Sequence, residues 1–201
     1  LSPSIAYKNS MKIVFATNNP NKIKEVQSLI PSHITLVSLE AIGCTKEVPE
    51  TQDSIKGNAI QKAAYIKENY GLDCFADDTG LEVIALNGAP GVYSARYAGP
   101  ERISEANMDL LLSELKYKTN RSAQFKTIIA LHYNGEIITF EGLCDGEITK
   151  EKKGAGGFGY DPIFKPLEDK LTFAELSIER KNQIGHRGKA VRKLVDYLNF
   201  I

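Results

Sequence analysis

Two long strand-like runs, residues 123–133 and 136–143, are joined by Asn134-Gly135. Asn-Gly is a strong signal for a two-residue hairpin turn, because both residues tolerate positive φ angles. The hairpin makes the two runs antiparallel neighbours and argues against a purely parallel sheet. Helix-like and strand-like segments interleave along the rest of the chain, which is typical of α/β folds. Together these features predict an α/β fold with a mixed central sheet and flanking helices.

Hydrophobic periodicity predicts the remaining elements. Residues 11–201 contain no linker, repeat or low-complexity segment, and their length suits one substantial domain or two small lobes sharing a cleft. Residues 1–10 precede Met11 and a strand-like run, and we interpret them as a leader or a remnant of expression. Either Asp53 or Ser54 is expected to cap the second helix. The expected strands lie at 12–17, 34–39 and 72–76, and the expected helices at 23–30 (ended by Pro31), from about 54, at 104–116 and from 186 onward.

The charge balance bears on the class of ligand. Lys plus Arg and Asp plus Glu number 25 each, which gives a formal net charge of zero. No global positive field is therefore available to hold a polyanion, and a nucleic-acid partner is not expected. A small anionic substrate remains open, because local clusters of charge decide that case.

Cysteine usage and hydropathy bear on the compartment. The three cysteines are widely spaced and form no CxxC pair, so neither a disulfide framework nor a zinc site is indicated. The apolar runs are far shorter than the ~20 residues needed to span a bilayer. The first ten residues lack the apolar core of a secretory signal. We expect a cytoplasmic protein without a membrane partner.

The segment Thr17-Asn18-Asn19-Pro20-Asn21-Lys22 interrupts the pattern between a strand and a helix. Such a turn directs main-chain N–H groups and a helix N-terminus at one point, which suits a phosphate. Lys22 adds a mobile positive charge. The alternative interpretation is a plain turn with a helix cap, since this is not the full P-loop pattern.

The pair Asp77-Asp78, followed by Thr79-Gly80, comes directly after the hydrophobic residues 74–76. Two adjacent carboxylates are costly to bury unless a cation joins them. Mg²⁺ suits such a site, because it binds one or two carboxylates together with water and substrate phosphates. Strand alternation sends the two side chains to opposite faces, so one of them together with Glu50 is a candidate ligand pair. An exposed turn between two strands is the alternative.

Two further clusters lie in the C-terminal third of the chain. Residues 154–161, GAGGFGYD, allow close approach of the backbone to a ligand, and Phe158 can stack on a flat ring. Lys181 and His186-Arg187 offer hydrogen-bond donors to acceptor groups. A flexible loop with Phe158 and Tyr160 in the core, and a solvated basic helix face, are the respective alternatives.

Taken in order, these clusters resemble the inosine triphosphate pyrophosphatase family, which hydrolyses non-standard purine nucleoside triphosphates. The resemblance covers nearly all of residues 11–200, and the ordered set of motifs is specific although each motif alone is weak. It rests on Glu50 and on the segments TNNPNK (17–22), NAIQKA (58–63), ADDTGL (76–81), GAPGVYSARYAG (88–99), GGFGYDPIF (156–164) and KNQIGHRGKA (181–190).

The resemblance implies an elongated fold of two lobes around an active-site cleft, a homodimer and a Mg²⁺ requirement. It implies hydrolysis of ITP, dITP and XTP to the monophosphate and pyrophosphate, with Asp78 as general base and Glu50 and Asp78 as metal ligands. The substrate-binding positions it implies are Thr17, Asn18, Asn19, Pro20, Asn21, Lys22, Lys62, Thr79, Phe158, Gly159, Tyr160, Asp161, Lys181, His186 and Arg187.

Base selectivity has a physical basis in this set. Inosine and xanthosine carry a 6-oxo acceptor, whereas adenosine carries a 6-amino donor. Donors from Lys181, His186 or Arg187 would pair with the oxo group and leave the amine unpaired, at a cost of about 1–3 kcal/mol. Two alternatives stay open: a nucleotide pyrophosphatase with another base preference, and a nucleotide-binding module without catalysis.

Overall fold

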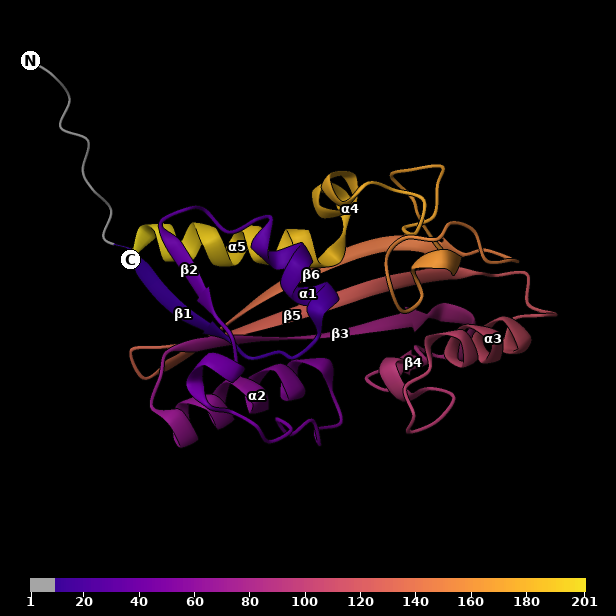
Figure 1. Ribbon diagram of the computed structural model, residues 1–201. Helices are drawn as coiled ribbons and strands as arrows, with labels where there is room; N and C mark the ends of the chain where they lie inside the picture. The colour runs from indigo at the N-terminus through magenta and orange to yellow at the C-terminus, as the bar shows by residue number, and fades with distance from the viewer. Residues whose placement is uncertain (1–9) are drawn as a thin grey trace, which may run out of the picture.

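The computed structural model describes residues 10–201, which fold around one sheet (Figure 1). In these residues seven strands form the order β2-β1-β3-β5-β6-β7, with β4 paired to β3 off this path. The strand β1 runs parallel to β2 and β3, and all other pairs are antiparallel. The strands are β1 (Met11–Phe15), β2 (Ile34–Val37), β3 (Cys74–Val83), β4 (Pro90–Gly91), β5 (Ser122–Tyr133), β6 (Glu136–Ile148) and β7 (Phe164–Pro166).

The predicted mixed α/β fold is confirmed. Strands β5 and β6 form the expected hairpin, with Tyr133 opposite Glu136 across the Asn134-Gly135 turn. Both residues of the turn adopt positive φ, 48° and 84°, as this turn requires. Strand β6 runs on to Ile148, beyond the expected end at residue 143, because its second half pairs with β5 and β7.

The helices begin and end at recognisable sequence signals. Helix α1 starts earlier than expected, since Asn19 caps it and Pro20 occupies the first turn, and it ends at Gln27, before Pro31. Of the two candidate caps for α2, Ser54 accepts the hydrogen bond from the Gly57 N–H. The α-helices are α1 (Pro20–Gln27), α2 (Ile55–Tyr70), α3 (Ser104–Glu114), α4 (Ile178–Ile184) and α5 (His186–Phe200).

The alternative interpretation of Asp77 to Gly80 as an exposed turn is wrong. Strand β3 is continuous from Cys74 to Val83, and every one of its residues pairs with β5. The adjacent carboxylates therefore lie within a strand and not after its end. The long partner strand β5 holds this polar segment extended, which the local sequence could not reveal.

Helices cover both faces of the sheet near β1 (Figure 1). On one face α2 packs Ala59, Ala63 and Ile66 against the even-numbered residues Cys74 and Ala76 of β3. On the other face α1 and α5 pack against the odd-numbered side of the same strand. The core there includes Val26, Phe75, Ile129, Val191, Leu194 and Leu198. The alternation of β3 thus assigns each residue to one helical layer.

The far end of the sheet has its own core. Strands β3, β5 and β6 extend into it, where α3 packs Met108 and Leu111 against Leu81 and Phe125 (Figure 1). Phe125 also contacts the ring of Phe164, with centroids 4.7 Å apart in an edge-on arrangement. The three long strands therefore connect two packed regions without a linker.

Helices long and apolar enough to cross a membrane are absent from residues 10–201. The predicted leader, residues 1–10, lies outside the described residues apart from Ser10. All three cysteines are free and buried, which agrees with the absence of a predicted disulfide framework.

Gly142 of β6 offers a test of how closely α5 approaches the sheet. A Cβ atom at this position would lie 1.9 Å from the carbonyl oxygen of His186 and 2.6 Å from the main-chain nitrogen of Ala190. We expect Gly142→Ala to lower the free energy of unfolding by about 1–3 kcal/mol, because the backbone of α5 or β6 must move to make room for the methyl group. Urea denaturation measures this change.

The matched control is Glu141→Ala, which changes the exposed neighbour on the same strand and keeps its backbone. It should alter the unfolding free energy by less than about 0.5 kcal/mol. Equal stability of Gly142→Ala and Glu141→Ala would contradict the close approach of α5 to β6.

Candidate active site

A cavity of about 550 Å³ opens where two neighbouring strands differ in length. Strand β1 ends at Phe15, and the chain leaves the sheet after Ala16, whose N–H donates to Phe75. Strand β3 continues, and β4 rejoins its edge only at Leu81. Between these two points β3 lacks a neighbouring strand on that edge, and its residues Asp78 and Thr79 line the cavity.

The structure gathers nearly all of the predicted site residues around this cavity. Asn21 does not line it: this residue is exposed, and its N–H donates to the side chain of Asn19. The predicted residues that do line it are Thr17, Asn18, Asn19, Pro20, Lys22, Glu50, Lys62, Asp78, Thr79, Phe158, Gly159, Tyr160, Asp161, Lys181, His186 and Arg187.

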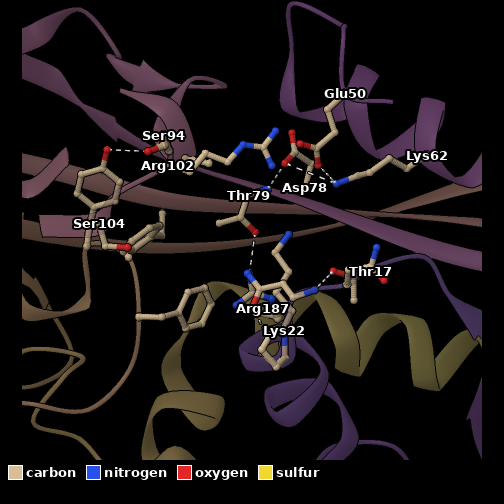
Figure 2. A pocket seen from close by; sticks show the side chains of 18 of the residues that line it. Thr17, Lys22, Glu50, Lys62, Asp78, Thr79, Ser94, Arg102, Ser104 and Arg187 are labelled. Atoms are coloured by element: carbon tan, nitrogen blue, oxygen red, sulfur yellow. Dashed lines mark hydrogen bonds and ion pairs between the residues drawn. The ribbon is translucent and has the colours of Figure 1, made fainter. Parts of the chain in front are cut away.

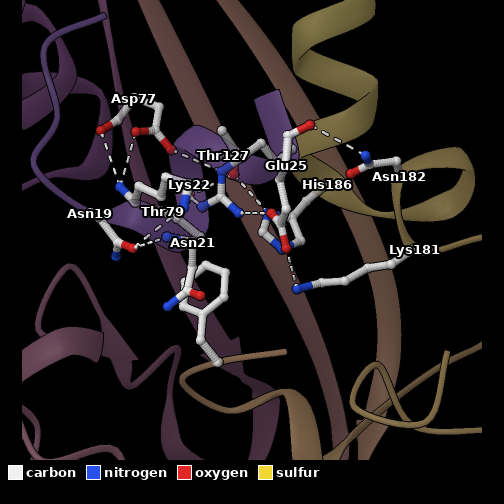
Figure 3. A network of polar contacts seen from close by, with 12 residues as sticks. Asn19, Asn21, Lys22, Glu25, Asp77, Thr79, Thr127, Lys181, Asn182 and His186 are labelled. Atoms are coloured by element: carbon white, nitrogen blue, oxygen red, sulfur yellow. Dashed lines mark hydrogen bonds and ion pairs between the residues drawn. The ribbon is translucent and has the colours of Figure 1, made fainter. Parts of the chain in front are cut away.

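Asp77 points to the face of β3 covered by α1 and α5 (Figure 3). Its Oδ1 accepts a hydrogen bond from Lys22 Nζ at 3.0 Å, and its Oδ2 accepts one from Arg187 Nε at 3.1 Å. Burial alone would raise the pKa of this carboxyl, but the cations Lys22 and Arg187 hold the pKa well below its usual range. Asp77 is therefore a charged anchor for two basic side chains.

Glu25 of α1 joins the basic residues of the two C-terminal helices. One carboxylate oxygen accepts from Lys181 Nζ at 2.6 Å, and the other accepts from Arg187 Nη1 at 2.5 Å. Burial tends to raise the pKa of Glu25, but the charges of Arg187 and Lys181 outweigh it and lower the pKa. Glu25 thus fixes α1 to α4 and α5 through buried ion pairs.

Asp78 points to the opposite face, where α2 and the loop before it supply Lys62 and Glu50 (Figure 2). Lys62 Nζ lies 2.5 Å from Glu50 Oε1 and 3.9 Å from Asp78 Oδ1. It also donates to the main-chain oxygen of Asp77 at 2.7 Å. The predicted separation of the two carboxylates to opposite faces of the strand is therefore confirmed.

The two oxygens of Asp78 differ. Oδ1 accepts the N–H of Thr79 at 2.9 Å, whereas Oδ2 is buried without a hydrogen-bond partner among the described residues. Burial raises the pKa of this carboxyl, although Lys62 and Lys22 oppose the rise. A buried carboxylate oxygen without a partner marks a position where a ligand, a water molecule or a cation supplies the missing contact.

The residues present fit a magnesium ion. Asp78 Oδ2 has no hydrogen-bond partner within residues 10–201, and Glu50 is half-buried on the same side of the strand. Groups of three or more acidic, His or Cys side chains that could hold a metal are not found in the described part of the chain. Mg²⁺ differs from ions that need a full protein cage, because it takes one or two carboxylates and completes its shell with water and substrate phosphates.

The other end of the cavity is aromatic and cationic. Lys181 Nζ lies 4.8 Å and the Arg187 guanidinium 5.5 Å from the centroid of the half-buried Phe158 ring. Tyr160 is buried, and its hydroxyl donates to the carbonyl oxygen of Ser94 at 2.8 Å, so the alternative that placed it in the core holds for this residue. The flat apolar face of Phe158 beside donors suits a heterocyclic base.

Several lining residues were not predicted. Arg102, Ser104 and Asn107 come from α3 and the loop before it, and all three line the cavity. In Figure 2 the guanidinium of Arg102 extends toward Glu50 and Asp78. They follow the GAPGVYSARYAG segment by a few residues, and that proximity was the available signal. The sequence signal for Glu25 was weaker: this residue lies three positions after Lys22 on a short helix. Burial tends to raise the pKa of Glu50, but the charge of Lys62 outweighs it, with smaller contributions from Lys22 and Arg102, and lowers the pKa.

The chain is an α/β protein with a mixed sheet. Its cavity is lined by lysines and carboxylates, a set of charges that suits a small anionic ligand. The chain belongs to the Ham1 family, whose model matches residues 13–197. A dITP/XTP pyrophosphatase of Flavobacterium johnsoniae is 60% identical over 188 residues, which cover 94% of this chain and 98% of that protein. One from Porphyromonas gingivalis is 49% identical over 188 residues, 93% of this chain and 97% of that protein.

Solved structures agree with this assignment. A HAM1 protein from Coxiella burnetii superposes with a TM-score of 0.88 at 36% identity, covering 95% of this chain and 100% of that one. The Staphylococcus aureus Ham1 protein gives a TM-score of 0.85 at 40% identity, covering 94% and 98%. The resemblance inferred from the ordered motifs is thereby confirmed.

Replacement of Glu25 tests the buried ion pairs. We expect Glu25→Gln to lower the free energy of unfolding at neutral pH by about 3 kcal/mol, because Lys181 and Arg187 lose a buried partner. The folded-state pKa of Glu25 is lowered, so its contribution is present above the unfolded pKa of about 4.3 and is lost as the pH falls through the folded value. Urea denaturation at several pH values measures both effects.

The control is Asp73→Asn, which removes the half-exposed pair with Lys67 and should cost less than about 1 kcal/mol. The difference between wild type and Glu25→Gln should shrink below about pH 4. A difference that stays constant down to strongly acidic pH would contradict the role of the Glu25 charge.

Proposed function

We propose that this protein hydrolyses the non-standard purine nucleoside triphosphates ITP, dITP and XTP to the nucleoside monophosphate and pyrophosphate. The observation that carries the proposal is the position of Lys22 and Lys62 on the two sides of β3 beside Asp78. Both ammonium groups approach the Asp77 carbonyl oxygen, at 3.5 Å and 2.7 Å. The names of the relatives and the cavity volume, which is in the range of nucleotide sites, support it.

The lysines retain capacity for a phosphate chain. Each ammonium has three donors, and each lysine uses two of them on protein oxygens. One donor on each side of the strand is therefore left for the oxygens of a polyphosphate. The positive N-terminal end of α1 lies next to Lys22, although its first main-chain N–H groups are already bonded, since Asn21 and Lys22 both donate to Asn19 Oδ1.

Asp78 is the proposed general base for a water that attacks the α-phosphorus, with pyrophosphate as the leaving group. Its Oδ2, which has no hydrogen-bond partner among the described residues, can accept the proton. Glu50 and Asp78 would hold Mg²⁺, which when bound neutralises charge on the phosphates. Thr79, the next residue of the strand, lines the cavity and is a proposed substrate contact.

At the base end, Phe158 offers a stacking face and Asp161 a carboxylate, with Lys181, His186 and Arg187 as donors. Lys181 and Arg187 are largely committed to Glu25, Asp161 and Asp77, so their positions are fixed before a ligand arrives. Fixed donors favour a 6-oxo group over a 6-amino group, because an unpaired buried amine is costly.

A homodimer and a cytoplasmic location are further parts of the proposal. Large apolar side chains are exposed on a single copy, among them Ile84, Tyr93 and Ile103 near the outer end of the sheet. A second copy of the chain that packed against these side chains would remove their apolar surface from water, which favours a dimer. Light scattering should give twice the chain mass, and a monomeric mass at micromolar concentration would refute the dimer.

Asp78→Asn tests the proposed base. Turnover of ITP should fall by at least about 10³-fold, because the amide cannot accept the proton, while nucleotide binding stays measurable by calorimetry. In the wild type, kcat should decline at acidic pH, since a protonated Asp78 carboxyl cannot accept a proton from water. Glu82→Gln, on the same strand and face outside the cavity, is the control and should keep turnover.

Product analysis tests the reaction itself. Hydrolysis in H₂¹⁸O should place the label in the monophosphate and release unlabelled pyrophosphate, and a chelator should stop turnover until Mg²⁺ is restored. Release of single phosphate, or comparable kcat/KM for ATP and ITP, would overturn the proposed reaction or base preference. A pyrimidine triphosphate preferred over ITP would point instead to a pyrophosphatase of another specificity.

A further inference from the structure

Thr127 is a fully buried hydroxyl residue on β5 with no role in the site described above. It lies opposite Thr79 in the register of β3 and β5. Its Oγ1 is 2.6 Å from Thr79 Oγ1 and 2.7 Å from His186 Nδ1 (Figure 3). The hydroxyl therefore connects a substrate-facing strand to the imidazole at the start of α5.

The direction of these hydrogen bonds follows from counting protons. Arg187 can only donate, so Thr79 Oγ1 accepts from Arg187 Nη2 at 3.1 Å. The acceptor within reach of the Thr79 proton is Thr127 Oγ1, which leaves the Thr127 proton for His186 Nδ1. The reverse direction would turn the Thr79 hydroxyl proton toward the cavity, where the described residues offer it no acceptor.

The imidazole is neutral and held in place. Burial pushes the pKa of His186 well below its usual value, and the charges of Arg187 and Lys181 lower it further. The ring of Phe125 stacks on the imidazole with centroids 4.6 Å apart, which fixes its plane. A neutral imidazole whose Nδ1 accepts a hydrogen bond carries its proton on Nε2. Nε2 has no hydrogen bond within residues 10–201, and His186 lines the cavity.

We propose that Thr127 is a positioning residue for base selectivity: its hydroxyl holds His186 in the Nε2–H tautomer, so that the cavity presents a donor. A base with an oxo acceptor at this point pairs with the donor, whereas an amino group meets a second donor. This inference rests on the proposed function, because it assigns the origin of selectivity at the same site. Strand β5 supplies no predicted site residue, but by this proposal it takes part in base recognition through Thr127.

Thr127→Val tests the inference, since valine has nearly the same shape and lacks the hydroxyl. The kcat/KM for ITP should fall about tenfold, which is the loss expected for one well-placed hydrogen bond, while that for ATP changes less than about threefold. Thr127→Ser restores the hydroxyl and should rescue the ITP-to-ATP ratio. If Thr127 had a merely structural role, its replacement would lower kcat/KM for ITP and for ATP by the same factor. An unchanged ratio of kcat/KM for ITP to kcat/KM for ATP in Thr127→Val would therefore overturn the proposal.

The tautomer can be read directly in the unaltered protein, whether or not the valine variant folds. Nitrogen NMR of the ¹⁵N-histidine-labelled wild type should show a protonated Nε2 and an unprotonated Nδ1 for His186, assigned with a His186→Gln sample. A protonated Nδ1 would overturn the inference. Failure of the wild type to release pyrophosphate from ITP would instead refute the proposed function and leave the NMR result to stand separately.

Discussion

The site depends on the burial of two adjacent carboxylates within one continuous strand. Buried charges cost several kcal/mol each unless they are paired, so the structure around Asp77 and Asp78 must supply cations. Because side chains alternate along β3, each carboxylate draws on a different helical layer: Lys22 and Arg187 for Asp77, Lys62 for Asp78. The strand thereby joins α1, α2 and α5 at one point, where β1 has already left the sheet.

The two faces then serve different purposes. On the side of Asp77 both carboxylate oxygens are paired, and Glu25 extends the ion pairs to Lys181. This network holds the basic groups rigidly, which reduces the cost of ordering them around a ligand. On the side of Asp78 one oxygen stays without a partner among the described residues. Both oxygens of Asp77 are therefore paired in the rigid network, whereas the unpaired oxygen of Asp78 lies where the reaction is proposed.

Much of this could be predicted from local sequence. The Asn134-Gly135 hairpin, the capped turn before Lys22 and the order of the motifs gave the fold class and most of the cavity lining. The continuity of β3 could not be predicted, because it depends on pairing with β5 over its whole length. Glu25 and Thr127 resemble an ordinary helical acid and an ordinary strand residue, and their importance comes from contacts with residues 50 or more positions away.

The most direct test of the central claim is a crystal structure of the Asp78→Asn variant with ITP and Mg²⁺. The account predicts the triphosphate along the free edge of β3, contacting Lys22 on one side and Lys62 on the other, with the base between Phe158 and His186. Density for the triphosphate away from both lysines, or a base bound outside the Phe158 end of the cavity, would contradict it.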